Sequence, residues 1–373
     1  MTATSNDYTL YVDGPTYYAK DLVTGNTLSN ASFSSLIAAL NTALGAAGGR
    51  VYIRGGTYNL DAQITITHPI DFLGAGRGKA ILLRTTAVNG TTIQFNTPGV
   101  NISGLTIDGN YPTQNINQFA ELAFGTGAGG ILVNDIEIRN FKTRGINNSN
   151  NGAGPVVISN CVIGPSTSSL AAALFSGVNT NTIVDSCNIS GLLGGGPFFG
   201  GRGIISKCVL ANNTGTAAGG DVAATTDGTY LGVFDCIIGP GPGTIDDSGI
   251  ELGPTNTPTT YECIGNVIFS KNGAGITSDP GATAPVIAVG NVIFNMGKSG
   301  IKMQGTGQSH FLIAKNICYN NQACGVDIST SAGAPIGVDS YTVKDNILYG
   351  NVLAQWQDMG TGTHKKIKDN IVL

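Results

Sequence analysis

The strongest constraint on the fold is a pattern that the sequence writes three times in a row between residues 266 and 328, with a period of 25 residues. Each copy starts with Asn and an aliphatic pair, and carries a Gly nine residues later. The starting residues are Asn266, Asn291 and Asn316, and the glycines are Gly275, Gly300 and Gly325. A period of this length is typical of stacked repeats, in which each unit buries its apolar face against its neighbours. The copies contain short β-branched runs without helical periodicity, so the pattern predicts a coil of strands, a parallel β-helix.

The position of the starting Asn, here called the slot, can be followed along most of the chain. Eleven coils align on the slot residues Leu105, Ile136, Cys161, Cys187, Cys208, Cys236, Asn266, Asn291, Asn316, Asn346 and Asn370. The residue two places after the slot is never polar, from Ile107 in the first aligned coil to Val372 in the last. Because side chains alternate across a strand, the slot should face the core and the residue just before it should face water.

Asn and Cys at an inward position need a physical explanation. Asn side chains in successive coils can hydrogen-bond to one another and to the turn backbone, which offsets the cost of burying them. The four stacked Cys are interpreted as small apolar packing residues. No CxxC pair or neighbouring His gives the spacing of a zinc site. Seven cysteines, an odd number, also fit a reduced interior better than a disulfide framework.

The repeated Asn-x-Ile, short loop and Gly-Ile resembles the right-handed parallel β-helix of the pectate-lyase-like superfamily, including its carbohydrate-binding and sugar-hydrolase branch. The resemblance covers roughly residues 50–373 and implies an all-β, single-stranded solenoid of about 11 to 13 coils. Residues 1–49 are predicted to form a separate N-terminal segment, with a β-hairpin over 8–28 and an amphipathic helix over 29–49. This segment resembles the start of phage tailspikes and surface β-helix proteins. It is expected to cap the first coil.

Composition limits the kinds of partner. Only 11% of the residues are charged, the formal net charge is -4 and the pI is about 5.3, so nucleic acid is not an expected partner. No apolar stretch approaches the length of a membrane span, and residues 1–7 do not look like an export signal. Virion or cell-surface location is the expectation from the tailspike resemblance, and the cytoplasm is the alternative.

Two stretches are predicted to be irregular, residues 109–130 and the glycine-rich residues 191–203. Function tends to sit on such loops of a solenoid. Phe198 and Phe199 lie in the second stretch. They are interpreted either as a sugar-stacking pair or, more simply, as anchors of the loop.

The outward residue of the Gly-Ile strand gives the candidate site. Eleven residues after the slot this column reads Asn147, Thr277, Lys302, Asp327 and Gln357, and Glu251 takes the same place after a local insertion. In the pectate-lyase-like superfamily the corresponding strand forms the floor of the saccharide groove. The catalytic candidates are Asp246, Asp247, Glu251 and Lys302, with Asp246, Asp247 and Lys298 expected at the groove rim. The substrate-binding candidates are Thr277, Asp327, Lys298, Arg144, Phe198 and Phe199.

Two functions remain open. The preferred one is a non-catalytic attachment or structural protein that contacts a polysaccharide or cell-surface glycan along the solenoid side. The alternative is a polysaccharide lyase, epimerase or glycosidase acting around Glu251 and Lys302, because paired carboxyls or a Lys base suit that chemistry. No cofactor or metal site is predicted, although a lyase would use Ca²⁺. Alternating charges on an outward strand can also be ordinary paired surface. Asp246-Asp247 resembles the paired Asp of polygalacturonases, but the other motifs of those enzymes are missing.

The residue one after the slot should face outward, yet it is aliphatic in seven successive coils. These residues are Val209, Ile237, Val267, Val292, Ile317, Ile347 and Ile371, here called the apolar stripe. A contiguous apolar band of this size usually marks a covered surface. The stripe predicts a homo-oligomer, a trimer by analogy with tailspikes. A loop of the same chain lying over the stripe is the alternative.

Overall fold

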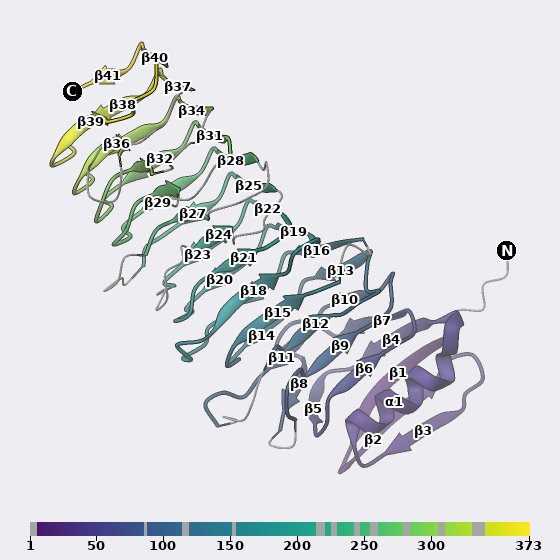
Figure 1. Ribbon diagram of the computed structural model, residues 1–373. Coiled ribbons are helices and arrows are strands. Elements are labelled where there is room, and N and C mark those ends of the chain that lie inside the picture. The colour runs from purple at the N-terminus through teal and green to yellow at the C-terminus, as the bar shows by residue number, and fades with distance from the viewer. Residues whose placement is uncertain are drawn as a thin grey trace. The chain divides into compact units, whose positions relative to one another are not determined.

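The computed structural model describes residues 6–85, 88–113, 119–150, 154–213, 221–224, 230–241, 247–253, 260–278, 284–304, 310–329 and 340–373. The chain divides into two compact units, Met1–Ile183 and Val184–Leu373. Both units are built almost entirely of short parallel strands (Figure 1). The two units are therefore described one at a time.

The first unit begins with three antiparallel strands, β1 (Asn6–Asp13), β2 (Thr16–Asp21) and β3 (Thr27–Asn30). Helix α1 (Phe33–Leu44) follows and ends in the 3-10 turn η1 (Gly45–Ala47). The predicted hairpin and helix are thus present. The helix is shorter than the predicted 29–49 because Ser32 caps it, its hydroxyl accepting a bond from the Ser35 N–H.

Helix α1 packs on the first coil through aromatic and polar contacts. The Phe33 ring lies 4.9 Å from the ring of Tyr58 and 5.4 Å from that of Tyr17. The Ser34 hydroxyl donates to the Ala62 carbonyl at 3.0 Å. Strand β1 also pairs in parallel with β4 (Gly49–Ile53), so the N-terminal strands extend the first sheet of the solenoid. Helix and hairpin together cover strand edges and apolar surface that an open first coil would expose.

Each coil passes through three sheets in turn. In the first unit, sheet A continues from β4 with β7 (Ile70–Gly74), β10 (Asn101–Ser103), β13 (Ile131–Asn134) and β16 (Pro155–Ser159). Sheet B contains β5 (Gly56–Leu60), β8 (Ala80–Arg84), β11 (Thr106–Asp108), β14 (Glu137–Arg139) and β17 (Val162–Ile163). Sheet C contains β6 (Ile64–Ile66), β9 (Ile93–Phe95), β12 (Leu122–Phe124), β15 (Arg144–Asn148) and β18 (Ala172–Ser176). Strand β12 lies inside 109–130, so that stretch is not irregular throughout.

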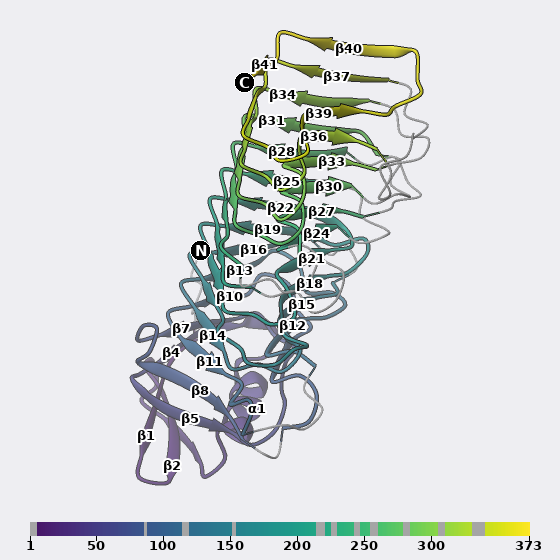
Figure 2. The same cartoon turned by 90° about the vertical axis from the view of Figure 1, so that its left-hand side faces the viewer.

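The second unit repeats this arrangement, with the strands of each sheet stacked one above another (Figure 2). Strand β19 (Asn181–Asp185) spans the sequence boundary between the two units. After it, sheet A contains β22 (Arg202–Ser206), β25 (Tyr230–Phe234), β28 (Thr260–Ile264), β31 (Val286–Val289), β34 (Phe311–Ala314), β37 (Ser340–Lys344) and β40 (His364–Lys368). Sheet B contains β20 (Asn188–Ser190), β23 (Val209–Ala211), β26 (Ile237–Ile238), β29 (Val267–Phe269), β32 (Val292–Phe294), β35 (Ile317–Tyr319), β38 (Ile347–Tyr349) and β41 (Ile371–Val372). Sheet C contains β21 (Pro197–Phe199), β24 (Val222–Ala224), β27 (Ile250–Leu252), β30 (Ile276–Ser278), β33 (Ile301–Met303), β36 (Cys324–Ile328) and β39 (Ala354–Asp358).

The turn from sheet A to sheet B has the same backbone conformation in all eleven aligned coils. The residue before each slot has a positive φ, between 52° and 71°. One left-handed residue reverses the local curvature of the backbone and produces a sharp corner. These residues are Gly104, Asp135, Asn160, Ser186, Lys207, Asp235, Gly265, Gly290, Lys315, Asp345 and Asp369. Gly, Asn and Asp adopt this conformation most readily, which accounts for their frequency at this position.

The predicted Asn ladder is confirmed in the second unit. Asn291 is fully buried, and its Nδ2 donates to Asn316 Oδ1 at 2.9 Å and to the Cys263 carbonyl at 2.9 Å. Its Oδ1 accepts from the backbone N–H and the Nδ2 of Asn266, both at 3.0 Å. The same bonds continue through Asn346 to Asn370. Every amide in the ladder interior therefore has its donors and its acceptor satisfied.

The repeated glycines are required by close approach of neighbouring coils. A Cβ on Gly275 would lie 2.6 Å from the Gly300 carbonyl oxygen, and one on Gly300 would lie 2.7 Å from that of Gly325. No side chain larger than hydrogen fits there without moving the backbone. The seven cysteines are all buried and carry free thiols, and the four stacked ones, Cys161, Cys187, Cys208 and Cys236, lie in the core as predicted.

Candidate functional site

The predicted column on sheet C forms in the second unit. Glu251 pairs in register with Thr277, Thr277 with Lys302, Lys302 with Asp327, and Asp327 with Gln357. Sequence offsets alone therefore placed these residues side by side, about 4.8 Å apart per coil. Their role in binding or catalysis stays a prediction.

Several polar side chains in and beside this column form ion pairs and hydrogen bonds with one another. Lys302 Nζ lies 3.3 Å from Asp327 Oδ2, with side chains only 14% and 6% exposed. The Ser329 hydroxyl donates to Asp327 Oδ1 at 2.6 Å, and Gln304 Nε2 donates to the Thr277 hydroxyl at 3.0 Å. A carboxylate and an ammonium held in this way are poorly suited to removing or delivering a proton.

The spacing of carboxyl groups in the column also disagrees with glycoside hydrolysis. Glu251 and Asp327 are three coils apart, roughly 14 Å between backbones at the usual strand spacing. An inverting glycosidase places its two carboxyls roughly 6.5 to 9.5 Å apart, and a retaining one closer still. Asp246 lies outside the described residues. Lys298 is exposed on the turn before β33.

Asp247 is not at the groove rim, where the sequence placed it. Its side chain is 2% exposed, and its Oδ2 lies 2.6 Å from Nζ of Lys271, which is fully buried. Asp221, 1% exposed, approaches the same Nζ with its Oδ2 at 2.9 Å. The turns from sheet B to sheet C in three successive coils supply these three side chains. Burial raises the pKa of Asp221 to about 7. Burial lowers the pKa of Lys271, but Asp221 and Asp247 more than offset this, so the net pKa is raised.

Sequence reasoning missed Lys271, although a signal was present. Five residues after the slot the chain has a second inward column, which contains Asn213, Gly241, Lys271, Met296, Asn321 and Asn351. A Lys in a column otherwise made of Asn, Met and Gly indicates a buried charge that needs partners.

Phe198 and Phe199 do not form a loop. They belong to strand β21, so the predicted irregular stretch over 191–203 is wrong at this point. Phe199 points into the core and is fully buried, which excludes it from contact with a glycan. Phe198 faces outward on sheet C and pairs in register with Ala223. The sugar-stacking pair is therefore corrected to Phe198 alone.

The first unit contains a separate polar arrangement on sheet C, centred on Arg144. The Arg144 guanidinium lies 4.1 Å from the centre of the Phe175 ring and 4.7 Å from that of Phe119. Its NH1 donates to Asn147 Oδ1 at 2.7 Å, and within the described ranges no carboxylate pairs with it. Burial lowers the Arg144 pKa, yet the guanidinium remains charged at neutral pH. We call Arg144, Phe119, Phe175 and Asn147 the arginine clamp. It combines a rigid cation with an aromatic ring, Phe119, that is 48% exposed.

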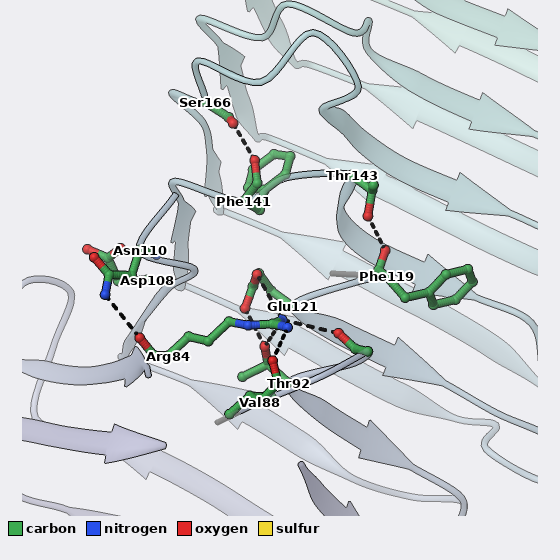
Figure 3. Close-up of polar contacts among 11 residues, drawn as sticks. Arg84, Val88, Thr92, Asp108, Asn110, Phe119, Glu121, Phe141, Thr143 and Ser166 are labelled. Atoms are coloured by element: carbon green, nitrogen blue, oxygen red, sulfur yellow. Dashed lines mark hydrogen bonds and ion pairs between the residues drawn. The ribbon is translucent and has the colours of Figure 1, made fainter. Parts of the chain in front are cut away.

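A buried polar network fixes the segment that carries Phe119 (Figure 3). Arg84 and Glu121 are fully buried 3.8 Å apart, and the Thr92 hydroxyl bridges them, accepting from Arg84 at 2.9 Å and donating to Glu121 at 2.6 Å. The Thr143 hydroxyl donates to the Phe119 carbonyl at 2.6 Å. The Phe119 ring points away from the Arg84 cluster (Figure 3). These bonds hold the backbone beside the ring without using the ring itself.

A third feature is a stack of aromatic rings on the outer face of sheet B in the second unit. The stack contains Phe269, Phe294, Tyr319 and Tyr349, three residues after each slot. Neighbouring ring centres are 4.9 to 5.2 Å apart, and the planes are within 7° of parallel. The inner rings cover each other's faces, so a sugar cannot stack on them. Their edges lie beside the apolar stripe, in which Val209, Ile237 and Ile371 are exposed.

Within the part of the chain that the structure describes, no helix is long and apolar enough to cross a membrane, and no group of His, Cys, Asp or Glu side chains could hold a metal ion.

The protein is a right-handed parallel β-helix, a fold that several solved structures share with it. The catalytic unit of a Streptomyces thermodiastaticus GH87 α-1,3-glucanase matches with a TM-score of 0.63 and 14% identity, over 91% of this chain and 65% of that one. The Dettilon tailspike protein gp208 matches with a TM-score of 0.54 and 12% identity, over 90% and 64%. The A-module of the Azotobacter vinelandii mannuronan C-5 epimerase AlgE6 matches with a TM-score of 0.52 and 13% identity, over 92% and 95%. At these identities the likeness is one of fold. No protein-family model matches the sequence, and no curated protein matches it.

Proposed function

We propose that this protein is a non-catalytic β-helix of a virion or cell surface, with a structural or attachment role, which contacts glycans along sheet C. The observation that carries the proposal is the arginine clamp of the first unit. A guanidinium held between two rings and bonded to an amide on one edge suits the recognition of a carboxylate or sulfate on a sugar. The exposed face of Phe119 suits packing against the apolar face of a sugar ring.

The state of the sheet C column in the second unit supports binding rather than catalysis. Lys302 and Asp327 neutralise each other, and Glu251 is roughly 14 Å from Asp327 along the column. The tailspike among the structural neighbours has the same fold, as do the enzymes. The neighbours therefore allow both functions, and the geometry of this chain supports binding.

Binding to a panel of neutral and acidic polysaccharides tests this proposal. We expect binding to acidic members and a loss of affinity of about 10- to 100-fold in Arg144→Ala, because a charge-assisted hydrogen bond contributes about 1.5 to 3 kcal/mol. Arg202 is the matched control, since it lies 5.5 Å from the Tyr230 ring on a different sheet. Arg202→Ala should bind like the wild type. Equal losses in both variants, or no binding to any glycan, would contradict the proposal.

The same panel decides between binding and catalysis. The wild type is expected to produce neither new reducing ends nor the ultraviolet absorbance of unsaturated sugars. Turnover that disappears in Glu251→Gln or Lys302→Ala would establish the enzyme alternative and place its site on sheet C of the second unit.

We also propose that the protein assembles as a homotrimer through the apolar stripe, with the aromatic stack beside it. Strand propensity favours β-branched and aromatic residues at any outward position, but the neighbouring outward column stays polar or Gly in every aligned coil, so propensity does not explain the difference. Light scattering coupled to size exclusion is expected to give the mass of a trimer for the wild type. Val292→Lys and Ile317→Lys should shift the mass toward the monomer, because each places a charge in an apolar contact. A wild-type monomer at high concentration would exclude this assembly.

A further inference from the structure

The cluster of Lys271, Asp221 and Asp247 has an unusual combination of burial and proximity. All three side chains are at most 2% exposed, and both carboxylates lie within 2.9 Å of one ammonium group. Nζ also donates to the Asn213 carbonyl at 3.1 Å, which fixes the end of the lysine side chain. The ammonium group and the two carboxylates are thus held in contact with one another, at a position that bulk water does not reach.

Gly241 is what allows the lysine to reach this position. A Cβ on Gly241 would lie 2.2 Å from Lys271 Nζ and 2.9 Å from its Cδ. The Lys271 side chain therefore occupies the space that a larger residue at position 241 would fill. Gly241 belongs to the coil that lies between the coils of Lys271 and Asn213. A buried lysine that crosses a neighbouring coil is placed by the fold and not by chance surface pairing.

The charges in the cluster do not balance when all three groups are ionised. Two carboxylates face one ammonium, and burial penalises every charge that remains. The raised pKa of Lys271 makes the ammonium its resting form, so a proton must first pass from Lys271 to Asp221 to give a neutral amine and a carboxylic acid. Asp221 can accept this proton directly, because its Oδ2 lies 2.9 Å from Nζ. A neutral amine beside a carboxyl group is the reactant pair for amide formation.

We propose that Lys271 and Asp247 condense to an intramolecular amide bond, with Asp221 carrying the protons. The bond that forms joins Nζ to Cγ of Asp247, and the bond that breaks joins Cγ to one of its carboxyl oxygens. That oxygen leaves as water with two protons, both originally on the Lys271 ammonium. Asp221 accepts a proton from Nζ, delivers it to the departing oxygen, and ends in its starting state. Nothing is oxidised or reduced, and no co-reactant is needed.

The amide links two successive coils of the second unit. Asp247 lies before β27 and Lys271 follows β29, so the bond closes a loop between residues 24 apart in sequence. A covalent link of this kind restricts the unfolded chain and resists peeling of one coil from the next. This inference is independent of glycan binding.

Mass spectrometry of the denatured wild-type protein tests the bond. We expect a mass lower than that of the sequence by one water molecule. Trypsin should fail to cleave after Lys271 and should release residues 208–298 as one peptide in place of 208–271 and 272–298. Loss of water at an Asp can also come from a succinimide, but a succinimide leaves Lys271 open to trypsin. Full mass and normal cleavage after Lys271 would overturn the proposal, whatever the variants do.

Lys302 supplies a control inside the same chain. It lies 3.3 Å from an Asp327 oxygen but retains 14% exposure. Trypsin is therefore expected to cleave after Lys302 in the sample in which Lys271 resists. Blocked cleavage at both lysines would point to incomplete digestion and would remove the support.

Variants and a second protease identify the bonded acid. Asp247→Ala and Asp221→Ala should both restore cleavage after Lys271, the first by removing the electrophile and the second by removing the proton carrier. Chymotryptic cleavage after Tyr230 separates Asp221 from the rest of the cluster. A bond to Asp247 leaves the piece of residues 208–230 that contains Asp221 free with an ordinary mass. Retention of that piece on the Lys271 peptide would overturn the assignment to Asp247.

Discussion

Replacing Lys271 with Met is expected to lower the free energy of unfolding by about 3 to 5 kcal/mol at pH 8, the usual cost of leaving buried charges without a partner. The substitution also removes the proposed cross-link, and the two losses act in the same direction. Denaturant titration of the wild type and the variant measures the difference. Lys368→Met is the control and should change stability by no more than about 1 kcal/mol, because the Lys368–Asp369 pair is exposed to water.

The loss in Lys271→Met should shrink as the pH falls toward 5. Without the lysine the two buried carboxylates have no counter-ion, so each binds a proton more readily in mild acid and ceases to be a buried charge. The wild type itself should lose stability as the pH rises from 5 to 8. Asp221 has a pKa raised to about 7 in the folded state, above its ordinary value, so its contribution is full in acid and disappears through neutral pH. Asp221→Asn should remove this slope. A penalty that is equal at pH 5 and pH 8 would show that the cluster carries no such charges.

Replacing Asn291 or Asn316 with Leu is expected to destabilise the protein more than the same change at Asn370, and Asn291 illustrates the reason. Asn291→Leu removes the acceptor of both the backbone N–H and the Nδ2 of Asn266, and each buried group left without a partner costs about 1 to 3 kcal/mol. Asn370→Leu should cost less. Asn370 is half-buried and has a ladder neighbour on one side only, Asn346. Thermal melting of the two variants and of Asn316→Leu makes the comparison. Equal shifts at all three sites would remove the ladder as a source of stability.

The fold could be read from the sequence because the slot repeats. Asn266, Asn291 and Asn316 occur with one period, so the direction of every side chain nearby follows from alternation. The same bookkeeping placed Lys302 beside Asp327 correctly. The aromatic stack and Lys271 also lie at fixed distances from the slot, so the same periodicity carries a signal for both.

The arginine clamp could be predicted only in part. Arg144 and Asn147 are candidates from the sequence, and Asn147 belongs to the outward column. Phe119 and Phe175 each lie 14 residues after a slot, but alternation does not fix the direction of Phe119 because it lies outside any strand. Its position depends on a loop that the Thr143 hydroxyl and the Arg84–Glu121 pair hold. Burial of Asp247 was missed for a similar reason, because its partner Lys271 lies on the next coil.

The eleven left-handed corner residues give one edge of the solenoid an unusual freedom. The backbone at each corner is the same whether the residue is Asp135, Ser186, Lys207 or Gly290. Their side chains lie outside the core and take no part in the ladder. Gly104 is an exception, because a Cβ there would lie 2.7 Å from the Gly74 carbonyl oxygen. At the other corners the charge of the surface can change from acidic to basic while the backbone of the coil keeps its path. Folding and surface chemistry are separable there, so a solenoid of this kind can change the electrostatic character that it presents to its surroundings without redesigning its interior.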